Sequence, residues 1–155
     1  MAEHESEALA HVRIQNLLAR YFQAVGVEDH DILRTDVIAE DAIWEVRLQS
    51  PQGTMQDRVE GREAILAWLR RSHDVRTGPL RPFVGTHVIE IDGDTARSVS
   101  HLMVHDITTL EHLANGVIHA EHVRTPDGWR MHRYLLEETM SGPRMGERQE
   151  IMGNG

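Results

Sequence analysis

The sequence predicts an α+β fold in which helices come first and an antiparallel sheet comes second. Apolar residues in the first half recur mostly at three- and four-residue spacings, which is typical of amphipathic helices packed on a core. The second half alternates apolar and polar residues, and Asp92-Gly93-Asp94 and Pro126-Asp127-Gly128 divide it as tight-turn signals. A run of helices followed by a run of strands is the α+β layout.

The individual elements follow from spacing and from their boundary residues. The helical pattern predicts helices over residues 7–25, 32–38 and 62–72. Gly26 ends the first of these helices, and Gly61 precedes the third. Alternation predicts strands over residues 42–48, 83–91, 96–107, 116–125 and 129–137. Pro51 and Gly53 predict a loop over residues 50–57.

The length of 155 residues favours one domain with one core. We expect a flexible N-terminus over residues 1–7 and a folded domain over residues 8–138. The tail over residues 139–155 is rich in Gly and Met, and we expect it either to be disordered or to lie over a pocket.

Composition excludes several chemistries. All 16 basic residues are Arg and there is no Cys, so lysine Schiff bases, thiol nucleophiles and cysteine-bound metals are excluded. Eleven His leave acid–base chemistry, an imidazole–carboxylate metal site, or binding alone. The net charge of −9 argues against a nucleic-acid partner. The first ten residues are not a secretory signal and no apolar run reaches the ~18 residues of a membrane span, so we expect a cytoplasmic protein with no membrane partner.

Five short segments, in this order, carry a family resemblance: IQNLLARYF (14–22), IAEDAIW (38–44), GREAI (61–65), DGDTA (92–96) and RTPDGW (124–129). Over roughly residues 8–138 the chain resembles the SnoaL-like branch of the NTF2-like superfamily. The resemblance implies a cone in which a curved antiparallel sheet wraps around the helices and encloses an apolar pocket. It also implies homodimers or homotrimers. Members include scytalone dehydratase, ketosteroid isomerase, polyketide cyclases and proteins that only bind or assemble.

The sequence departs from the dehydratase pattern of that family at the key positions. The resemblance implies a carboxylate at the end of the first helix and a histidine at the start of the first meander strand, where this chain has Gly26 and Phe83. Glu28 and Asp29 are possible substitutes for the carboxylate. Members of the family typically work without a metal, so the resemblance implies no metal and no cofactor.

Strand parity predicts which side chains face the pocket. The turn after Asp92 pairs odd positions before it with even positions after it, and the family register extends this set to the last two strands. The inward-facing residues are then Phe83, His87, Leu102, Val104, Asp106, Ile118, His122, His132, Tyr134 and Leu136. Tyr21 and Trp44 add aromatic walls, whereas His101, Met103 and His105 face outward.

Four of these side chains form the predicted catalytic group. We expect Asp106 and His122 to act as an acid–base pair, because an imidazole titrates near neutrality and a carboxylate stabilises its cation. Tyr134 and His87 would orient the substrate and polarise an oxygen on it. The hypothesis is a cofactor-independent isomerase, dehydratase, cyclase or epoxide-opening enzyme that acts on a hydrophobic small molecule.

Several alternatives stay open. Gly26 and Phe83 favour a protein that binds a ligand without catalysis, and an assembly module predicts a cone filled by side chains. In another interpretation, Asp106 caps a turn and each inward histidine has only a structural role. A metal site would need the outward residues, which are His101, His105, His119 and Glu121.

Overall fold

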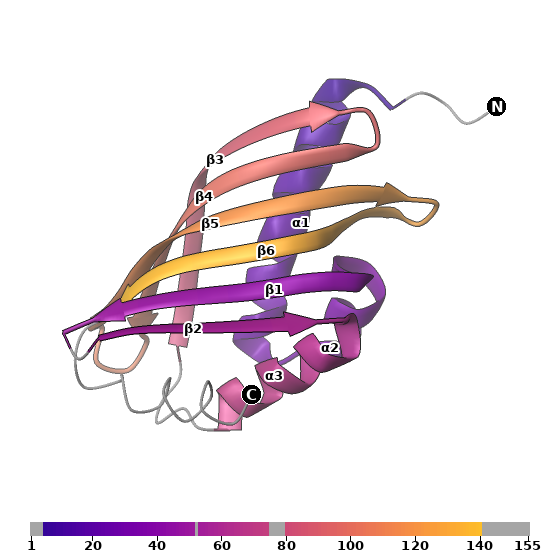
Figure 1. Ribbon diagram of the computed structural model, residues 1–155. Helices are drawn as coiled ribbons and strands as arrows, with labels where there is room; N and C mark the ends of the chain where they lie inside the picture. Colours follow the sequence, from indigo (N-terminus) through magenta and orange to yellow (C-terminus); the bar gives the residue numbers. More distant parts are fainter. Residues whose placement is uncertain (1–4, 52, 75–79, 141–155) are drawn as a thin grey trace.

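A computed structural model of the chain describes residues 5–51, 53–74 and 80–140 (Figure 1). Its helical elements are α1 (Glu7–Val27), α2 (His30–Ile32), a π-helical turn η1 (Leu33–Val37) and α3 (Arg62–Asp74). Its strands are β1 (Ile38–Ser50), β2 (Gly53–Glu60), β3 (Leu80–Asp92), β4 (Thr95–Asp106), β5 (His112–Thr125) and β6 (Gly128–Met140). The α+β fold class is confirmed.

The six strands form one curved sheet in the order β2-β1-β6-β5-β4-β3. Strands β3 to β6 are the predicted antiparallel meander, but β1 pairs with β6 in parallel. The sheet is therefore mixed: the predicted antiparallel pairing holds for the meander, and the pair of β1 and β6 is parallel. The long α1 crosses one face of the sheet (Figure 1), and the core lies between this inner face and the helices.

Strand β2 was not predicted from the sequence. It pairs with β1 along its whole length, from Ser50 opposite Gly53 to Ile43 opposite Glu60. The turn signals at Pro51 and Gly53 mark only the hairpin between the two strands. Because β2 is an edge strand with alternate side chains in solvent, it carries too few apolar residues to show a strand pattern. The loop expected over residues 50–57 is wrong for this reason.

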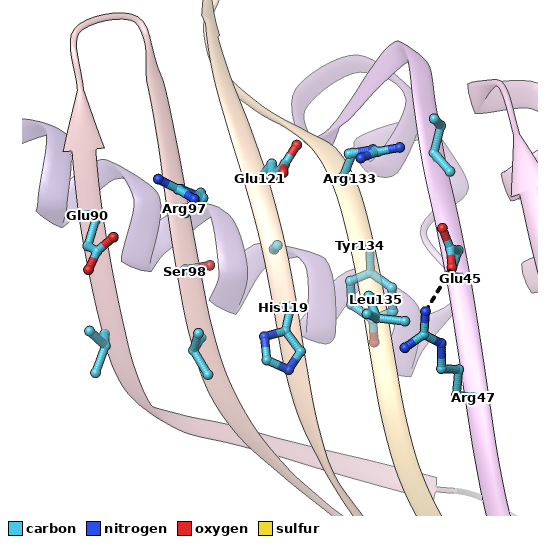
Figure 2. A pocket seen from close by; sticks show the side chains of 14 residues that line it. Glu45, Arg47, Glu90, Arg97, Ser98, His119, Glu121, Arg133, Tyr134 and Leu135 are labelled. Atoms are coloured by element: carbon cyan, nitrogen blue, oxygen red, sulfur yellow. Dashed lines mark ion pairs between the residues drawn. The ribbon is translucent and has the colours of Figure 1, made fainter.

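The outer face of the sheet is covered by none of the helices among the described residues. Figure 2 looks onto this face, with α1 behind the strands. Charged side chains from β1, β3, β4, β5 and β6 project from it. Among the described residues, no helix is long and apolar enough to cross a membrane.

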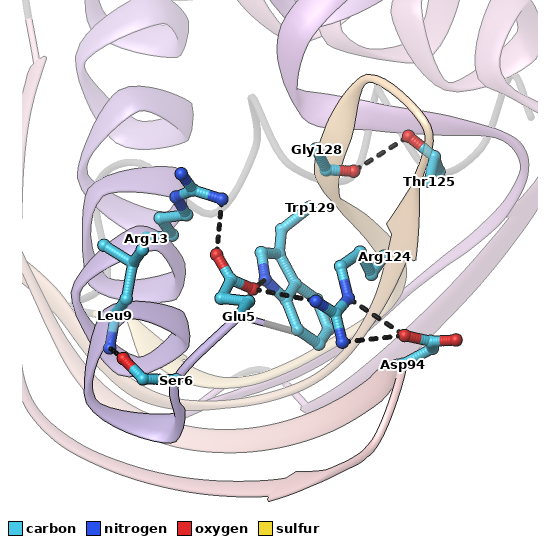
Figure 3. A network of polar contacts seen from close by, with 9 residues as sticks. All are labelled: Glu5, Ser6, Leu9, Arg13, Asp94, Arg124, Thr125, Gly128 and Trp129. Carbon is cyan, nitrogen blue, oxygen red and sulfur yellow. Dashed lines mark hydrogen bonds and ion pairs between the residues drawn. The ribbon is translucent and has the colours of Figure 1, made fainter. Parts of the chain in front are cut away.

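The first described residues contact the end of the sheet at which β5 turns into β6. Ser6 caps α1 by accepting a hydrogen bond from the amide of Leu9 at 3.2 Å. The Glu5 carboxylate is almost fully buried and accepts the indole N–H of Trp129 at 2.9 Å (Figure 3). It also pairs with Arg13 and Arg124. Residues 5 and 6 of the N-terminal segment expected over residues 1–7 thus make specific contacts, and residues 1–4 lie outside the described part.

Bulges in two strands change the parity of their side chains. In β3 the register shifts between Gly85 and Val88, where Thr86 adopts a left-handed φ of 50°. Figure 1 shows that β3 is bent along its length. In the β5–β6 pair the register shifts so that Glu121 faces Arg133 but His122 faces Met131. His132 is the extra residue of that second bulge. Each bulge moves the residues before it to the opposite face from the one that simple alternation predicts.

Candidate functional site

The inner face of the sheet holds a cavity of about 70 Å³ at one end of the molecule. Its walls come from the C-terminal half of α1, from α3, and from β1, β3, β4 and β6. Most of the lining is apolar, and the polar lining groups are Tyr21, Ser72, Tyr134 and Glu138. The other lining residues are Phe22, Val25, Gly26, Val46, Trp68, Leu69, Leu80, Pro82, Leu102, Val104 and Leu136.

Two tyrosine side chains line the inner wall of this cavity, and Trp44 packs against them from behind. The rings of Trp44 and Tyr134 are stacked with their centroids 5.1 Å apart, and the Tyr21 ring lies 5.4 Å from that of Tyr134. The indole N–H of Trp44 donates to the Tyr21 hydroxyl oxygen at 3.1 Å. The structure therefore brings together the two expected aromatic walls and Tyr134. Both tyrosines line the cavity, whereas Trp44 supports them from behind.

Glu138 is a charged lining residue that was not predicted from the sequence. Glu138 is only 2% exposed, so a carboxyl group lies inside a mostly apolar site. Glu138 follows Tyr134 and Leu136 at even positions of β6, and all three face inward. Its even position agrees with the inward set, but the strand was expected to end at residue 137.

The neighbouring strand β5 has a glycine opposite Glu138, and this glycine lets the two strands lie close together. Gly116 of β5 lies directly opposite Glu138 in the register. A Cβ at Gly116 would lie 2.6 Å from the carbonyl oxygen of Glu137 and 3.0 Å from the Leu136 side chain. Only glycine therefore allows β5 to approach β6 this closely beside the cavity.

Asp106 lies at the end of β4 and does not line the cavity. Its Oδ1 accepts the backbone N–H groups of Thr108 at 2.8 Å and of Thr109 at 3.0 Å. These bonds satisfy the first amides of the β4–β5 connection. Asp106 thus makes the turn-capping contacts that were kept as its alternative role.

His122 is buried at the opposite end of the inner face, 1% exposed, where its Nε2 lies 2.8 Å from the Ser98 hydroxyl. Its Nδ1 has no hydrogen-bond partner among the described residues. Burial lowers the pKa of His122 to about 4, because a charged imidazolium would lose its hydration there. The residue is therefore neutral near pH 7, and it does not line the cavity.

The proposed pair of Asp106 and His122 does not exist. His122 pairs with Ala96 at the start of β4, whereas Asp106 is ten residues further along the same strand. At about 3.3 Å per residue, the two positions are about 33 Å apart along β4. Both side chains face inward as parity predicts, but they lie at opposite ends of the sheet. This part of the catalytic hypothesis is wrong.

Among the remaining candidates, His87 faces inward but pairs with a serine. Its Nδ1 lies 2.7 Å from the Ser100 hydroxyl, and partial burial lowers the pKa of the imidazole. It does not line the cavity. Ile118 is fully buried in the core between Ser100 and Leu136 and also lies outside the cavity lining. Leu102, Val104 and Leu136 do line it.

The two bulges correct two further placements. Phe83 lies before the β3 bulge, so its ring faces outward, is 52% exposed and packs against His105. Val84 and Pro82 take the inward positions of that strand instead. His132, the bulge residue of β6, lies 3.4 Å from Asp41 and is partly exposed, so it is not a pocket residue.

The outward histidines do not form a metal site. His101 and His119 are exposed on the outer face, and His105 stacks on His112 with centroids 5.2 Å apart. Among the described residues, no three His, Cys, Asp or Glu side chains are grouped so that they could hold a metal ion. The geometry therefore gives the alternative metal site no support.

The chain belongs to the SnoaL-like family, whose domain model matches residues 6–134. No functionally curated protein matches the chain. An NTF2-like protein with a cystatin-like fold from Novosphingobium aromaticivorans is similar in structure (TM-score 0.66, 22% identity, covering 90% of this chain and 86% of that one). So is the beta subunit of a putative aromatic-ring-hydroxylating dioxygenase from the same organism (TM-score 0.71, 12% identity, 88% and 93% covered).

A third similar structure is that of LinA (TM-score 0.67, 15% identity, covering 83% of this chain and 85% of that one). At these identities the likeness extends to the fold alone. The neighbours therefore establish the cystatin-like, NTF2-like cone, and they agree with the resemblance noted in the sequence.

Proposed function

We propose that the chain is a cofactor-independent enzyme that transfers a proton on a small, mostly apolar molecule held in the inner cavity. Glu138 is the proton-transfer group, in place of Asp106 and His122. The observation that carries the proposal is a carboxyl group buried in the lining of a mostly apolar cavity. Walls that exclude water let such a group exchange a proton with a bound substrate in preference to solvent.

The two tyrosines supply the second part of the mechanism. A hydroxyl group can donate a hydrogen bond to a carbonyl or hydroxyl oxygen on which negative charge develops as a proton leaves a neighbouring carbon. Tyr134 lies on the same face of the same strand as Glu138, and the two flank Leu136. The stacked Trp44 ring and the bond from Trp44 to Tyr21 fix the orientation of this wall.

The size of the cavity favours a second candidate function. At about 70 Å³ it is smaller than the roughly 300–1,000 Å³ of typical ligand pockets. A nearly filled cone is what an assembly module would have, in which the fold supports a partner and binds no small molecule. For the enzyme, the same size limits the substrate to a compact molecule or requires lining side chains to move on binding.

Proton exchange tests the proposal without knowledge of the product. The purified protein is screened by thermal shift against small apolar ketones, lactones and alcohols, and ligands that bind are incubated with it in deuterium oxide. NMR then follows the incorporation of deuterium at carbon. We expect Glu138→Gln to bind the ligand but to exchange at least about 100-fold more slowly. Tyr134→Phe should slow exchange by a smaller factor.

Asp106→Asn is the matched control, because it makes the same carboxylate-to-amide change outside the cavity. Its exchange rate should equal that of the unmodified protein. Equal exchange by Glu138→Gln and the unmodified protein would remove Glu138 from the mechanism. If no compound in the panel binds, the assembly candidate takes first place.

A further inference from the structure

A broad groove of about 1,370 Å³ adjoins the cavity, between the C-terminal end of α1 and the start of β3. We propose that the substrate occupies both spaces, with its reacting end in the cavity and an extended apolar chain in the groove. The proposed substrate class is a ketone whose carbonyl group lies near one end of a long alkyl chain. This inference rests on the proposed function, since it names a substrate class for the same site.

The cavity and the groove share part of their lining. Phe22 and Gly26 of α1 and Leu80 and Pro82 of β3 line both spaces. We call the place defined by these four residues the junction. The two spaces therefore meet along one short stretch of α1 and β3, and a ligand seated there would contact both.

Gly26 determines how much space the junction has. It lies in the last turn of α1, and a Cβ added at this position would meet no neighbouring atom within 4 Å. The backbone of Gly26 is helical, so a larger residue fits there without backbone strain and its side chain extends into this space. The lack of a side chain at Gly26 therefore leaves the junction open to a ligand.

The two volumes favour a substrate that extends beyond the cavity. The cavity of about 70 Å³ is below the roughly 300–1,000 Å³ of typical ligand pockets, whereas the groove is larger than this range. Only the reacting end of the substrate has to fit beside Glu138 and Tyr134. The size limit of the cavity then applies to that end alone, and the rest of the molecule lies in the groove.

The groove exposes apolar side chains that a ligand would cover. Val27 is 76% exposed, Phe83 is 52% exposed and Ile107 is 39% exposed, and all three line the groove. Apolar side chains gathered in one exposed groove are typical of a binding site for an apolar ligand. They favour an alkyl chain, because each methylene group that leaves water contributes to the affinity.

The charged side chains of the groove do not favour an ionised chain. Arg20 pairs with Asp36 at 3.1 Å, and the Asp29 carboxylate accepts the backbone N–H of Ile32 at 3.1 Å. None of the four junction residues is charged. An ionised group would lose its hydration at the junction without gaining a partner there, so the part of the substrate that crosses it is uncharged.

The chain in the groove also positions the reacting carbon. Contacts along the groove hold the carbonyl end at the cavity wall, where the Tyr134 hydroxyl donates a hydrogen bond to the carbonyl oxygen. The Glu138 carboxylate takes a proton from the carbon next to the carbonyl group, and an enolate forms. In deuterium oxide the protonated carboxyl group exchanges with solvent and returns a deuteron to the same carbon. The substrate gains and loses no electrons, so the step needs no oxidant.

A homologous series of methyl ketones, from 2-butanone to 2-decanone, tests the proposal. NMR titration gives Kd for each ketone, and deuterium incorporation gives kcat/KM. A fully buried methylene group improves affinity about fourfold and a half-covered one about twofold, so we expect Kd to fall roughly 60-fold over the series. The value of kcat/KM should rise in parallel. A Kd that does not depend on chain length would assign the groove to a different partner and overturn the proposal.

Variants at the junction and in the groove locate the effect. Gly26→Phe fills the junction with a ring, so it should abolish most of the advantage of 2-decanone over 2-butanone. Ile107→Asp changes an exposed residue that lines the groove but not the cavity. It should weaken the binding of 2-decanone at least about fourfold, the equivalent of one buried methylene group, and leave that of 2-butanone unchanged. Leu110→Asp is the matched control, because it makes a similar change at an exposed residue of the same connection outside the groove.

The two readouts separate this inference from the proposed function. Exchange at a rate that is independent of chain length would retain the enzyme but overturn the groove. A length-dependent Kd that Gly26→Phe removes, without any exchange, would overturn the enzyme and retain the groove as a binding site for an apolar chain. Equal effects of Ile107→Asp and Leu110→Asp on 2-decanone, or no binding by any ketone of the series, would overturn the inference.

Discussion

Each end of the inner face contains a buried polar side chain, but only one end has a cavity beside that side chain. At the end where Glu5 binds Trp129, His122 is buried against Ser98, and the core is packed around it. At the other end Glu138 lines a cavity between the sheet, α1 and α3. We call these the sealed end and the cavity end. An inward direction alone does not make a functional side chain, because space beside it is also required.

The largest effect is expected at the sealed end, on lowering the pH. The unfolded chain protonates His122 near the ordinary pKa of 6.5, whereas the folded chain does so only near 4. Between these values the unfolded state binds more protons, so stability falls as the pH falls. The 2.5 pH units correspond to about 3 kcal/mol lost by pH 4. Urea unfolding from pH 7 to pH 4 measures this loss.

His122→Leu should flatten that pH dependence, because it removes the titrating group. Ser98→Ala is its control: it removes the hydroxyl but keeps the buried imidazole, so the steep dependence should remain. If His122→Leu and the unmodified protein lose stability in parallel, the buried histidine is not the cause.

A smaller effect is expected at the cavity end, from Gly116→Ala. The added methyl group meets the Glu137 carbonyl and the Leu136 side chain, so β5 and β6 must separate beside Glu138. Overpacking of this kind costs about 1–3 kcal/mol. The free energy of unfolding should fall by that amount, and any ligand found for the cavity should bind more weakly. Unchanged stability would show that the two strands are less closely fitted than the structure indicates.

The smallest effect is expected from Gly26→Ala at the mouth of the cavity. Gly26 lies in the last turn of α1, and nothing lies within 4 Å of an added Cβ. Alanine favours the helix by up to about 1 kcal/mol over glycine, so thermal unfolding should move to a slightly higher temperature. A loss of stability would mean that the end of α1 is more crowded than the structure shows.

Much of the fold could be predicted from the sequence, because helices and strands carry different periods. The spacing of apolar residues predicts α1 to within a few residues. The turn signals at Gly93 and Gly128 do the same for the strands of the meander. Strand β2 was not predicted, because an exposed edge strand does not alternate between apolar and polar residues. The parallel pairing of β1 with β6 is a long-range contact, which no local pattern encodes.

The candidate site could be predicted only in part. Alternation placed Leu102, Val104, Tyr134 and Leu136 on the inner face, and the structure has them around the cavity. Phe83 and His132 were misplaced, because a single bulged residue reverses parity without a sequence signal. The pairing of Asp106 with His122 failed because parity gives the face of a strand and not the position along it.

The parallel pair of β1 and β6 also determines when the protein can finish folding. Ile43 and Arg133 are neighbours in the sheet but are 90 residues apart in the chain. During synthesis, β1 leaves the ribosome early and can pair only with β2 until β6 emerges. For that period the apolar inner side of β1, with Trp44, Val46 and Leu48, has no sheet neighbour on one edge. Until residues 128–140 have emerged, the chain therefore exposes an apolar hairpin, which makes this stage the natural point for a chaperone to act.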